Sequence, residues 1–207
     1  MQAFICETGI AAPLEGRNID TDQIIPARFL KTDRSNGYGH LLCHDLRFDA
    51  NGEENAGFIL NREPFRQATI IVADVNFGCG SSREGAVYAL ADFGIRSVIA
   101  PSFGDIFYNN CLKNGIVPVR LDENIVSELR TALAQAADPC VTVDLQNLVV
   151  TMPGGARHGF AIDAFWRDCL LQGLDDLELT LKHEQDIRDF ESTYYEQMPW
   201  ARVPDIA

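Results

Sequence analysis

The sequence lacks a long apolar run, a secretory leader and an excess of positive charge, and each absence excludes a class of protein. No apolar run approaches the ~20 residues that a membrane-spanning helix needs. Residues 1–7 contain neither the basic nor the apolar region of a signal peptide. The formal net charge is −13, so nucleic acid is not expected as a partner, because phosphate binding requires a basic face. We therefore expect a cytoplasmic protein without membrane contact.

The cysteines are too dispersed for a metal site or a disulfide framework. None belongs to a Cys-x-x-Cys pair, and their spacing to the histidines matches no zinc pattern. A chain of 207 residues without a secretory signal does not require disulfides. We expect reduced, mostly buried thiols and no metal ligands at the six positions, which are Cys6, Cys43, Cys79, Cys111, Cys140 and Cys169.

Strands and helices alternate over residues 69–121, which predicts an α/β fold with a parallel-rich central sheet and flanking helices. The length suits a single domain over residues 1–207, with a core at about 1–160 and a charged helical tail at about 161–207. Apolar runs predict strands at residues 69–75, 97–100 and 116–121, and the segments between them predict helices at residues 81–93 and 103–113.

Residues 75–86 join a predicted strand to a predicted helix, and two glycines at the joint permit a sharp turn or the close approach of a ligand. Ser81 and Glu84 have the spacing of a capping box, which predicts that the helix begins at Ser81. A helix N-terminus attracts anions, so the cation at Arg83 indicates that a negative group lies opposite it. The simpler interpretation is that this stretch forms only a helix cap.

Three better-known motifs are absent from this stretch. A dinucleotide-binding fingerprint requires a glycine where Arg83 stands. No Gly-Lys-Ser or Gly-Lys-Thr follows to form a P-loop, and the chain has no Gly-x-Ser-x-Gly of the hydrolase type. The stretch therefore belongs to none of these nucleotide-binding or serine-hydrolase classes.

Residues 18–31 place two aspartates around a threonine, ahead of an apolar pair and a proline. Asp20 and Asp22 at this spacing are typical of a helix cap or an Asx-turn, and we favour that interpretation over a role in orienting a cation or a hydroxyl. Residues 32–61 are polar and rich in glycine and asparagine, which predicts a long loop with short pieces of structure. Loops of this length in compact domains are often functional lids.

Four blocks of the sequence stand out, in order along the chain. They are NIDTDQIIPARFLK at residues 18–31, GCGSSRE at 78–84, PSFGDIFYNNC at 101–111 and GLDDLELTL at 173–181. These blocks resemble the small subunits of 3-isopropylmalate dehydratases, which belong to the aconitase superfamily. Each block alone is moderately specific, and four in register over nearly the whole chain are strong support.

The resemblance implies a swivelling α/β domain that is active only as a heterodimer with a larger subunit. In this family the large subunit holds a [4Fe-4S] cluster on three cysteines, which agrees with the lack of cluster-ligand spacing here. The implied reaction is that of a hydro-lyase, which isomerises a 2-hydroxy diacid by dehydration and rehydration across a carbon–carbon double bond. The implied substrates are 2-isopropylmalate and 3-isopropylmalate in leucine biosynthesis, with no cofactor on this chain.

The resemblance also assigns roles to the polar residues of the joint. Ser81 is the general base, acting as an alkoxide. A free serine hydroxyl is far too weakly acidic for this at neutral pH, but nearby backbone N–H groups, the helix dipole and Arg83 would stabilise the anion. The planar fork of Arg83 suits a substrate carboxylate, and Ser82 adds a hydrogen bond to the substrate.

Two further positions are assigned to substrate binding. Asp22 matches a family position near the site, where it could orient a group of the larger subunit. Lys31 aligns with a segment that sets preference for the side group of the substrate. A cation there favours a polar or acidic side group, whereas an isopropyl group favours apolar residues, which residues 32–42 could supply.

One departure from the family pattern concerns Gly85, because the family usually has histidine directly after the Ser-Ser-Arg-Glu run. A histidine there could hydrogen-bond within the loop or face the substrate. The departure leaves the reaction class intact and opens two alternatives. The chain could serve a paralogous hydratase acting on citraconate or methylmalate, dimethylmalate or homoaconitate, or it could be a non-catalytic module that binds small acids.

Overall fold

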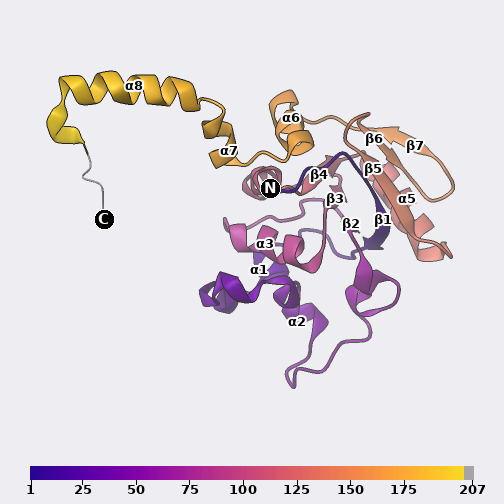
Figure 1. Ribbon diagram of the computed structural model, residues 1–207. Helices are drawn as coiled ribbons and strands as arrows, with labels where there is room; N and C mark the ends of the chain where they lie inside the picture. Colours follow the sequence, from indigo (N-terminus) through magenta and orange to yellow (C-terminus); the bar gives the residue numbers. More distant parts are fainter. Residues whose placement is uncertain (203–207) are drawn as a thin grey trace.

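The computed structural model describes residues 1–202 as a seven-stranded sheet with helices packed against it (Figure 1). The strands are β1 (Cys6–Pro13), β2 (Ile70–Val72), β3 (Ser97–Ala100), β4 (Val117–Arg120), β5 (Cys140–Asp144), β6 (Val149–Thr151) and β7 (Arg157–Gly159). Their order is β4-β3-β2-β1-β5-β6-β7. The first four of these pair in parallel, and the last three continue antiparallel from β1. The predicted α/β fold with a parallel-rich sheet is confirmed.

Helices and strands alternate along the chain from β2 to α5, where the sequence predicted this alternation. The α-helices are α1 (Thr21–Ile24), α2 (His44–Arg47), α3 (Glu84–Phe93), α4 (Asp105–Lys113), α5 (Glu123–Gln135), α6 (Ala164–Gln172), α7 (Asp176–Leu181) and α8 (Glu184–Gln197). Short 3₁₀ helices lie at Ala27–Lys31, Arg34–Asn36, Gly39–Leu41, Ile59–Asn61, Phe65–Gln67 and Pro199–Ala201. None of α1 to α8 within residues 1–202 has the length and apolar character to cross a bilayer.

Two buried clusters cover the two faces of the parallel strands. Ile71 and Val98 belong to the cluster that includes α3 and α4, whereas Ile70, Val72 and Ile99 belong to the cluster that includes α5 and α6. All five side chains are fully buried. A parallel sheet covered on both faces needs apolar residues at consecutive positions rather than at alternating ones. This is why the strands were readable from the sequence as continuous apolar runs.

The chain between β1 and β2 forms a compact irregular layer against α3. Its predicted character, a long loop with short pieces of structure, is confirmed over residues 32–61, which contain only 3₁₀ turns and the four-residue α2. Tyr38, Leu42 and Leu60 of this layer are nevertheless buried in the α3 cluster. Asp92 on α3 ties the layer down, because its carboxylate accepts a hydrogen bond from the Tyr38 N–H at 2.6 Å and pairs with Arg34.

A buried hydrogen-bonded pair closes the same layer. The Nε of Arg47 donates to the Oδ1 of Asn61 at 3.0 Å, and the Nδ2 of Asn61 donates to the Arg47 carbonyl at 2.6 Å. Arg47 is only 8% exposed and Asn61 only 6%. Burial lowers the pKa of Arg47, so this guanidinium depends on its hydrogen-bond acceptors for stabilisation.

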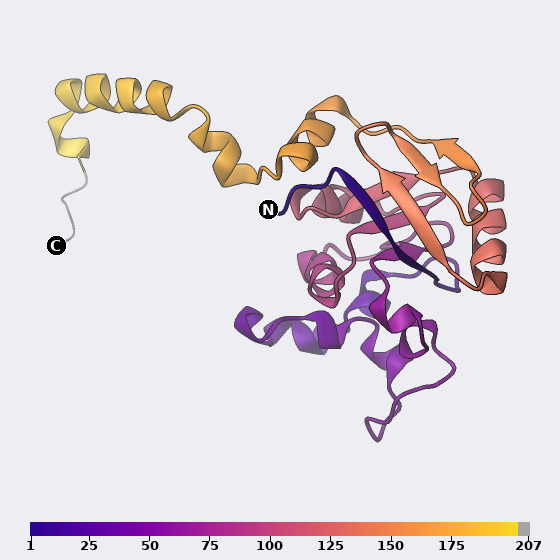
Figure 2. The same ribbon diagram turned by 45° about the vertical axis from the view of Figure 1, so that its right-hand side comes forward.

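The C-terminal helices leave the body of the fold. Leu170 on α6 is fully buried against the sheet, but α7 and α8 extend outward as an arm that is clear of the sheet in two views (Figures 1 and 2). The segment expected as a helical tail at about 161–207 forms α6 on the body and α7 and α8 in the arm, and no residue of α8 is buried. Residues 203–207 of that expectation lie outside the described residues.

We predict that Asn61→Ala lowers the free energy of unfolding by about 2–4 kcal/mol, because it leaves the buried Arg47 guanidinium without its Nε acceptor. Asn51→Ala is the matched control, since the Asn51 side chain is exposed and bonds only its neighbour Asp49. The control is expected within about 0.5 kcal/mol of the unmodified chain. Denaturant titration of both variants checks this, and equal midpoints would show that the buried pair does not stabilise the layer.

Candidate active site

The loop between β2 and α3 is held on both sides by backbone hydrogen bonds, as though the sheet continued beyond its strands. On one side it pairs with the loop after β1, and on the other with the loop after β3. Functional groups of parallel sheets gather at this carboxyl edge. The bonds run from Gly78 N to Ile19 O at 2.8 Å, from Thr21 N to Cys79 O at 3.0 Å, from Phe77 N to Ser102 O at 3.0 Å and from Gly104 N to Phe77 O at 2.9 Å.

Two glycines make this three-segment packing possible. Gly78 has a φ of 71°, and a Cβ on it would overlap the ring of Phe107 on α4. A Cβ on Gly104 would lie 2.5 Å from the carbonyl oxygen of Gly78. A side chain at position 78 would have to displace the Phe107 ring and adopt a left-handed backbone, and one at position 104 would have to move the Gly78 backbone, so the loop geometry depends on both glycines.

The helix after the loop begins later than predicted. The capping box from Ser81 to Glu84 is wrong, because α3 starts at Glu84 and its N-cap is Arg83, which makes no side-chain cap bond. The Ser81 carbonyl instead accepts a hydrogen bond from the Thr21 hydroxyl at 2.7 Å. This bond comes from another segment of the chain and holds Ser81 outside the helix.

Ser81 is therefore exposed, and its hydroxyl is free to contact a ligand. Within residues 1–202, its hydroxyl makes no hydrogen bond to another residue. The side chain therefore does not serve the helix cap and is open to a ligand in front of α3. The positive end of the helix dipole lies just behind it.

The negative group expected opposite Arg83 is present, and it is Asp22. An Arg83 nitrogen pairs with Asp22 on α1, and the arginine side chain is 13% exposed against 53% for the aspartate. The Arg83 guanidinium holds the pKa of the Asp22 carboxyl below its ordinary value. The cap interpretation holds for Asp20, whose carboxylate accepts from the Gln23 N–H at 2.8 Å in a capping box. The sequence predicted the charge that faces Arg83 but not the residue that carries it.

A cavity of about 280 Å³ has Ser81 and Arg83 in its lining but not Asp22. It is lined by the β2–α3 loop, by Thr21 and by the start of α4. Ser81 and Arg83 are thus brought together in one concave site that can hold a small acid. Thr21, 2% exposed, is a site residue that sequence reasoning missed. Its signal was a β-branched polar residue between the two aspartates.

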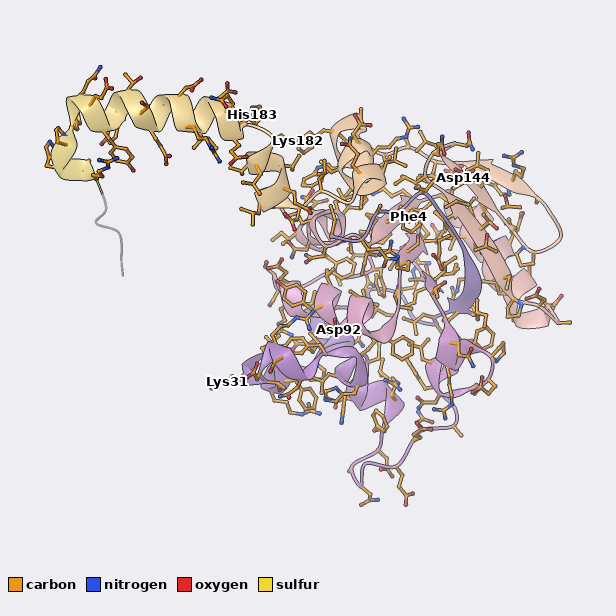
Figure 3. The ribbon with its side chains drawn as sticks, viewed as in Figure 1. Phe4, Lys31, Asp92, Asp144, Lys182 and His183 are labelled. Carbon is orange, nitrogen blue, oxygen red and sulfur yellow. The ribbon has the colours of Figure 1, made fainter. Side chains whose placement is uncertain are left out.

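Ser82 and Lys31 are not among the residues that line this cavity. Lys31 is exposed at the end of the first 3₁₀ turn and lies at the outer edge of the body in Figure 3. Its neighbour Leu30 nevertheless reaches the start of α3, where a Cβ on Gly85 would lie 2.9 Å from the Leu30 Cδ2. The family departure at Gly85 and the turn carrying Lys31 therefore pack against one another.

A larger cavity of about 780 Å³ lies elsewhere, between α5 and residues 57–65, and shares no lining residue with the smaller one. Both of its arginines make hydrogen bonds within the fold, although the Nε of Arg130 has no partner among residues 1–202. Arg130 bonds the Asp74 carboxylate at 3.1 Å, and Arg62 donates to the Ala56 carbonyl at 2.8 Å. The smaller cavity is the better candidate, because it combines an uncommitted hydroxyl with a cation at a helix N-terminus.

The residues described here hold no metal-binding cluster. Among residues 1–202, no group of three or more His, Cys, Asp or Glu side chains could hold an ion. Cys79 is the one cysteine that lines the small cavity, and its Sγ lies 3.5 Å from the Asn18 carbonyl. A single thiol is not the set of three cysteines that, by the family resemblance, holds an iron–sulfur cluster.

Comparison with known proteins gives a consistent result over the whole chain. Residues 1–124 match the family model of the aconitase C-terminal domain. Residues 179–201 match the model for the C-terminal domain of the 3-isopropylmalate dehydratase small subunit. The 3-isopropylmalate dehydratase small subunit of Rhodospirillum rubrum is 52% identical, over 98% of each chain. That of Dinoroseobacter shibae is 50% identical, over 97% of this chain and 100% of its own.

A solved structure agrees with the fold. The crystal structure of 3-isopropylmalate dehydratase from Methanocaldococcus jannaschii matches with a TM-score of 0.63 and 27% identity. The match covers 90% of this chain and 99% of that one.

We predict that Arg83→Ala raises the pKa of Asp22 toward the ordinary value of an aspartate, because the positive charge that stabilises the carboxylate is removed. The ion pair contributes stability at neutral pH and loses it as the pH falls through the lowered folded-state pKa. Carboxyl NMR titration of both proteins checks this. Asp49 is the internal control, since its pKa is lowered by hydrogen bonds within its own turn and should not move. An unchanged Asp22 titration would mean that the two groups do not interact.

Proposed function

Since the chain belongs to the aconitase C-terminal domain family, and within it to the 3-isopropylmalate dehydratase small subunits, we propose that it serves the isomerisation of 2-isopropylmalate and 3-isopropylmalate. It does so in the cytoplasm, in leucine biosynthesis, as the small subunit of a heterodimeric hydro-lyase. The main support for the proposal is that the Ser81 hydroxyl, which makes no hydrogen bond within residues 1–202, and the Arg83 guanidinium line the same cavity.

Ser81 is the general base of this proposal. The reaction removes a proton from the carbon next to a carboxylate and expels hydroxide from the neighbouring carbon, which leaves a carbon–carbon double bond. The Ser81 alkoxide takes the proton and becomes a hydroxyl, and it returns the proton when water adds back in the other orientation. Arg83 and the N-terminus of α3 stabilise the alkoxide form.

Arg83 also binds the substrate. Asp22 engages one nitrogen of its fork, and the remaining N–H groups are available to donate to a carboxylate in the cavity. Asp22 therefore acts as a positioning residue that fixes the direction of the arginine. Ser82, exposed beside Ser81, is proposed to hydrogen-bond the substrate once the larger protein encloses the site.

The group that assists departure of hydroxide is proposed to belong to the large subunit. The cysteines of this chain do not fit a cluster, since Cys43, Cys111 and Cys169 are buried and Cys6 is exposed. A [4Fe-4S] cluster on the large subunit would supply a Lewis acid for the hydroxyl group.

The preference for the side group of the substrate is proposed to lie where Gly85 meets Leu30. Because the glycine leaves room for Leu30, the turn that carries Lys31 can approach the start of α3. In this proposal Lys31 is the residue of that turn that faces the side group of the substrate. Citraconate and related acids are the second candidate substrates, and the same assay that measures isopropylmalate turnover compares them.

We predict that Ser81→Ala lowers the kcat of the assembled enzyme by about 10²–10⁴-fold, because proton transfer loses its base. KM should change little, since the hydroxyl acts in the transition state. Stability should change by less than about 0.5 kcal/mol, because the Ser81 hydroxyl caps no helix. Ser127→Ala, an exposed serine on α5, is the control with unchanged kinetics. A near wild-type kcat for Ser81→Ala would show that Ser81 is not the general base.

Arg83→Lys should raise KM about tenfold or more, because lysine keeps the charge but loses the two-pronged contact with a carboxylate. Steady-state kinetics normalised to assembled complex measure this. Arg66→Lys is the matched control, since Arg66 makes a two-pronged pair with Glu54 on the surface. If both substitutions leave KM unchanged, Arg83 does not bind the substrate.

The isolated chain is predicted to form no stoichiometric iron–sulfur cluster, because its cysteines are scattered. Anaerobic reconstitution with iron and sulfide, followed by visible spectroscopy and iron analysis, checks this. A tight chromophore lost on substitution of these cysteines would contradict the assignment of the cluster to the large subunit.

A further inference from the structure

The C-terminal arm, residues 174–202, is fastened to the body only at its base. The Met1 amino group bonds the Gly173 carbonyl at 2.9 Å and Glu178 at 3.3 Å. Lys113 on α4 reaches Asp176 at 3.3 Å. Beyond this base the chain turns at Lys182 and His183, which Figure 3 shows at the joint between α7 and α8, and α8 continues away from the sheet.

An isolated helix of this kind needs a surface to pack on. The 14 residues of α8 include no buried side chain. Helices of this length are marginal in water, because nucleation is unfavourable and most helical stability in proteins comes from tertiary packing. We therefore expect α8 to pack against the surface of another protein.

The arm exposes an apolar stripe. Ile187, Phe190 and Tyr194 recur at the spacing of one helix face, and the rings of Phe190 and Tyr194 stack with centroids 5.5 Å apart. Phe190 is 65% exposed, and Trp200 beyond the helix is 82% exposed. Exposed aromatic residues of this kind are the usual anchors of protein interfaces.

The charge around the stripe indicates what covers it. The helix carries five acidic residues and one arginine. Glu184 and Glu191 flank the stripe on one side and Asp186 on the other, by the helical spacing of 3.6 residues per turn. A second copy of this chain is a poor partner, because its net charge is also −13. The complementary surface is an apolar groove with a basic rim.

We propose that the C-terminal arm docks in such a groove on the large subunit, with Phe190 and Trp200 as anchors. This rests on the proposed function, which requires a large subunit. The family model for the C-terminal domain of the 3-isopropylmalate dehydratase small subunit matches residues 179–201, so the sequence of the arm recurs in other small subunits. The arm then tethers the two subunits at a distance from the cavity of Ser81 and Arg83.

The first test compares two variants that add the same charge on opposite faces of α8. Phe190→Asp should weaken binding of the full-length chain to the large subunit about thirtyfold, as for loss of an interface anchor. Ser192→Asp, on the face away from the stripe, should change the Kd by less than about twofold. Calorimetry or sedimentation with purified large subunit measures both. At saturating large subunit, kcat of the Phe190→Asp variant should equal that of the wild type.

The second test reverses the flanking charge. Glu184→Lys with Glu191→Lys should weaken binding about tenfold or more and reduce its dependence on salt, whereas Glu196→Lys on the opposite face should not. Circular dichroism confirms that the variants fold.

The outcomes separate this proposal from the one on which it rests. Failure of the wild-type chain to bind the large subunit overturns the proposed function and the docking together. Unchanged binding by Phe190→Asp overturns the docking alone. Sedimentation of the small subunit by itself provides a further check, because a dimer that Phe190→Asp disrupts would make a second copy the occupant and would also overturn the proposal.

Discussion

The candidate site depends on one constraint, which is that three backbone segments approach more closely than side chains allow. Residues 77–79 lie between the loops after β1 and β3 and bond to both. Gly78 lies against the Phe107 ring, and Gly104 against the Gly78 carbonyl. The position of Ser81, the ion pair of Arg83 and the small cavity follow from this packing. The glycines thus determine where the side chains of the candidate site lie.

The fold was largely predictable, because a sheet covered on both faces leaves continuous apolar runs such as the one around Ile71. The helix start was not predictable, since the Ser81–Glu84 spacing is a local signal and the bond from Thr21 comes from a distant segment. The same limit applies to Arg83, where the sequence indicated a negative partner without identifying Asp22. Short strands such as β7 were missed because three residues give no period to detect.

The departure from the family pattern at Gly85 has a structural counterpart. The absent side chain leaves the space that Leu30 occupies, and Tyr38 lies next to it. Tyr38 is in turn fixed by Asp92 on α3. A side chain at position 85 would therefore displace Leu30, so the start of α3 and the turn that carries Lys31 form one structural unit.

The three-segment construction of the site also determines when it comes into being as the chain folds. Its pairings join residue 20 to 79 and residue 77 to 103, so no local stretch can assemble it. Contacts between residues far apart in sequence form late, because closing long loops costs entropy before any contact is gained. A partly folded chain therefore lacks the bond from Thr21 to Ser81 and the pairing of Arg83 with Asp22. The candidate site is therefore complete only once the segments after β1, β2 and β3 have met, so its geometry reports on correct assembly of this part of the sheet.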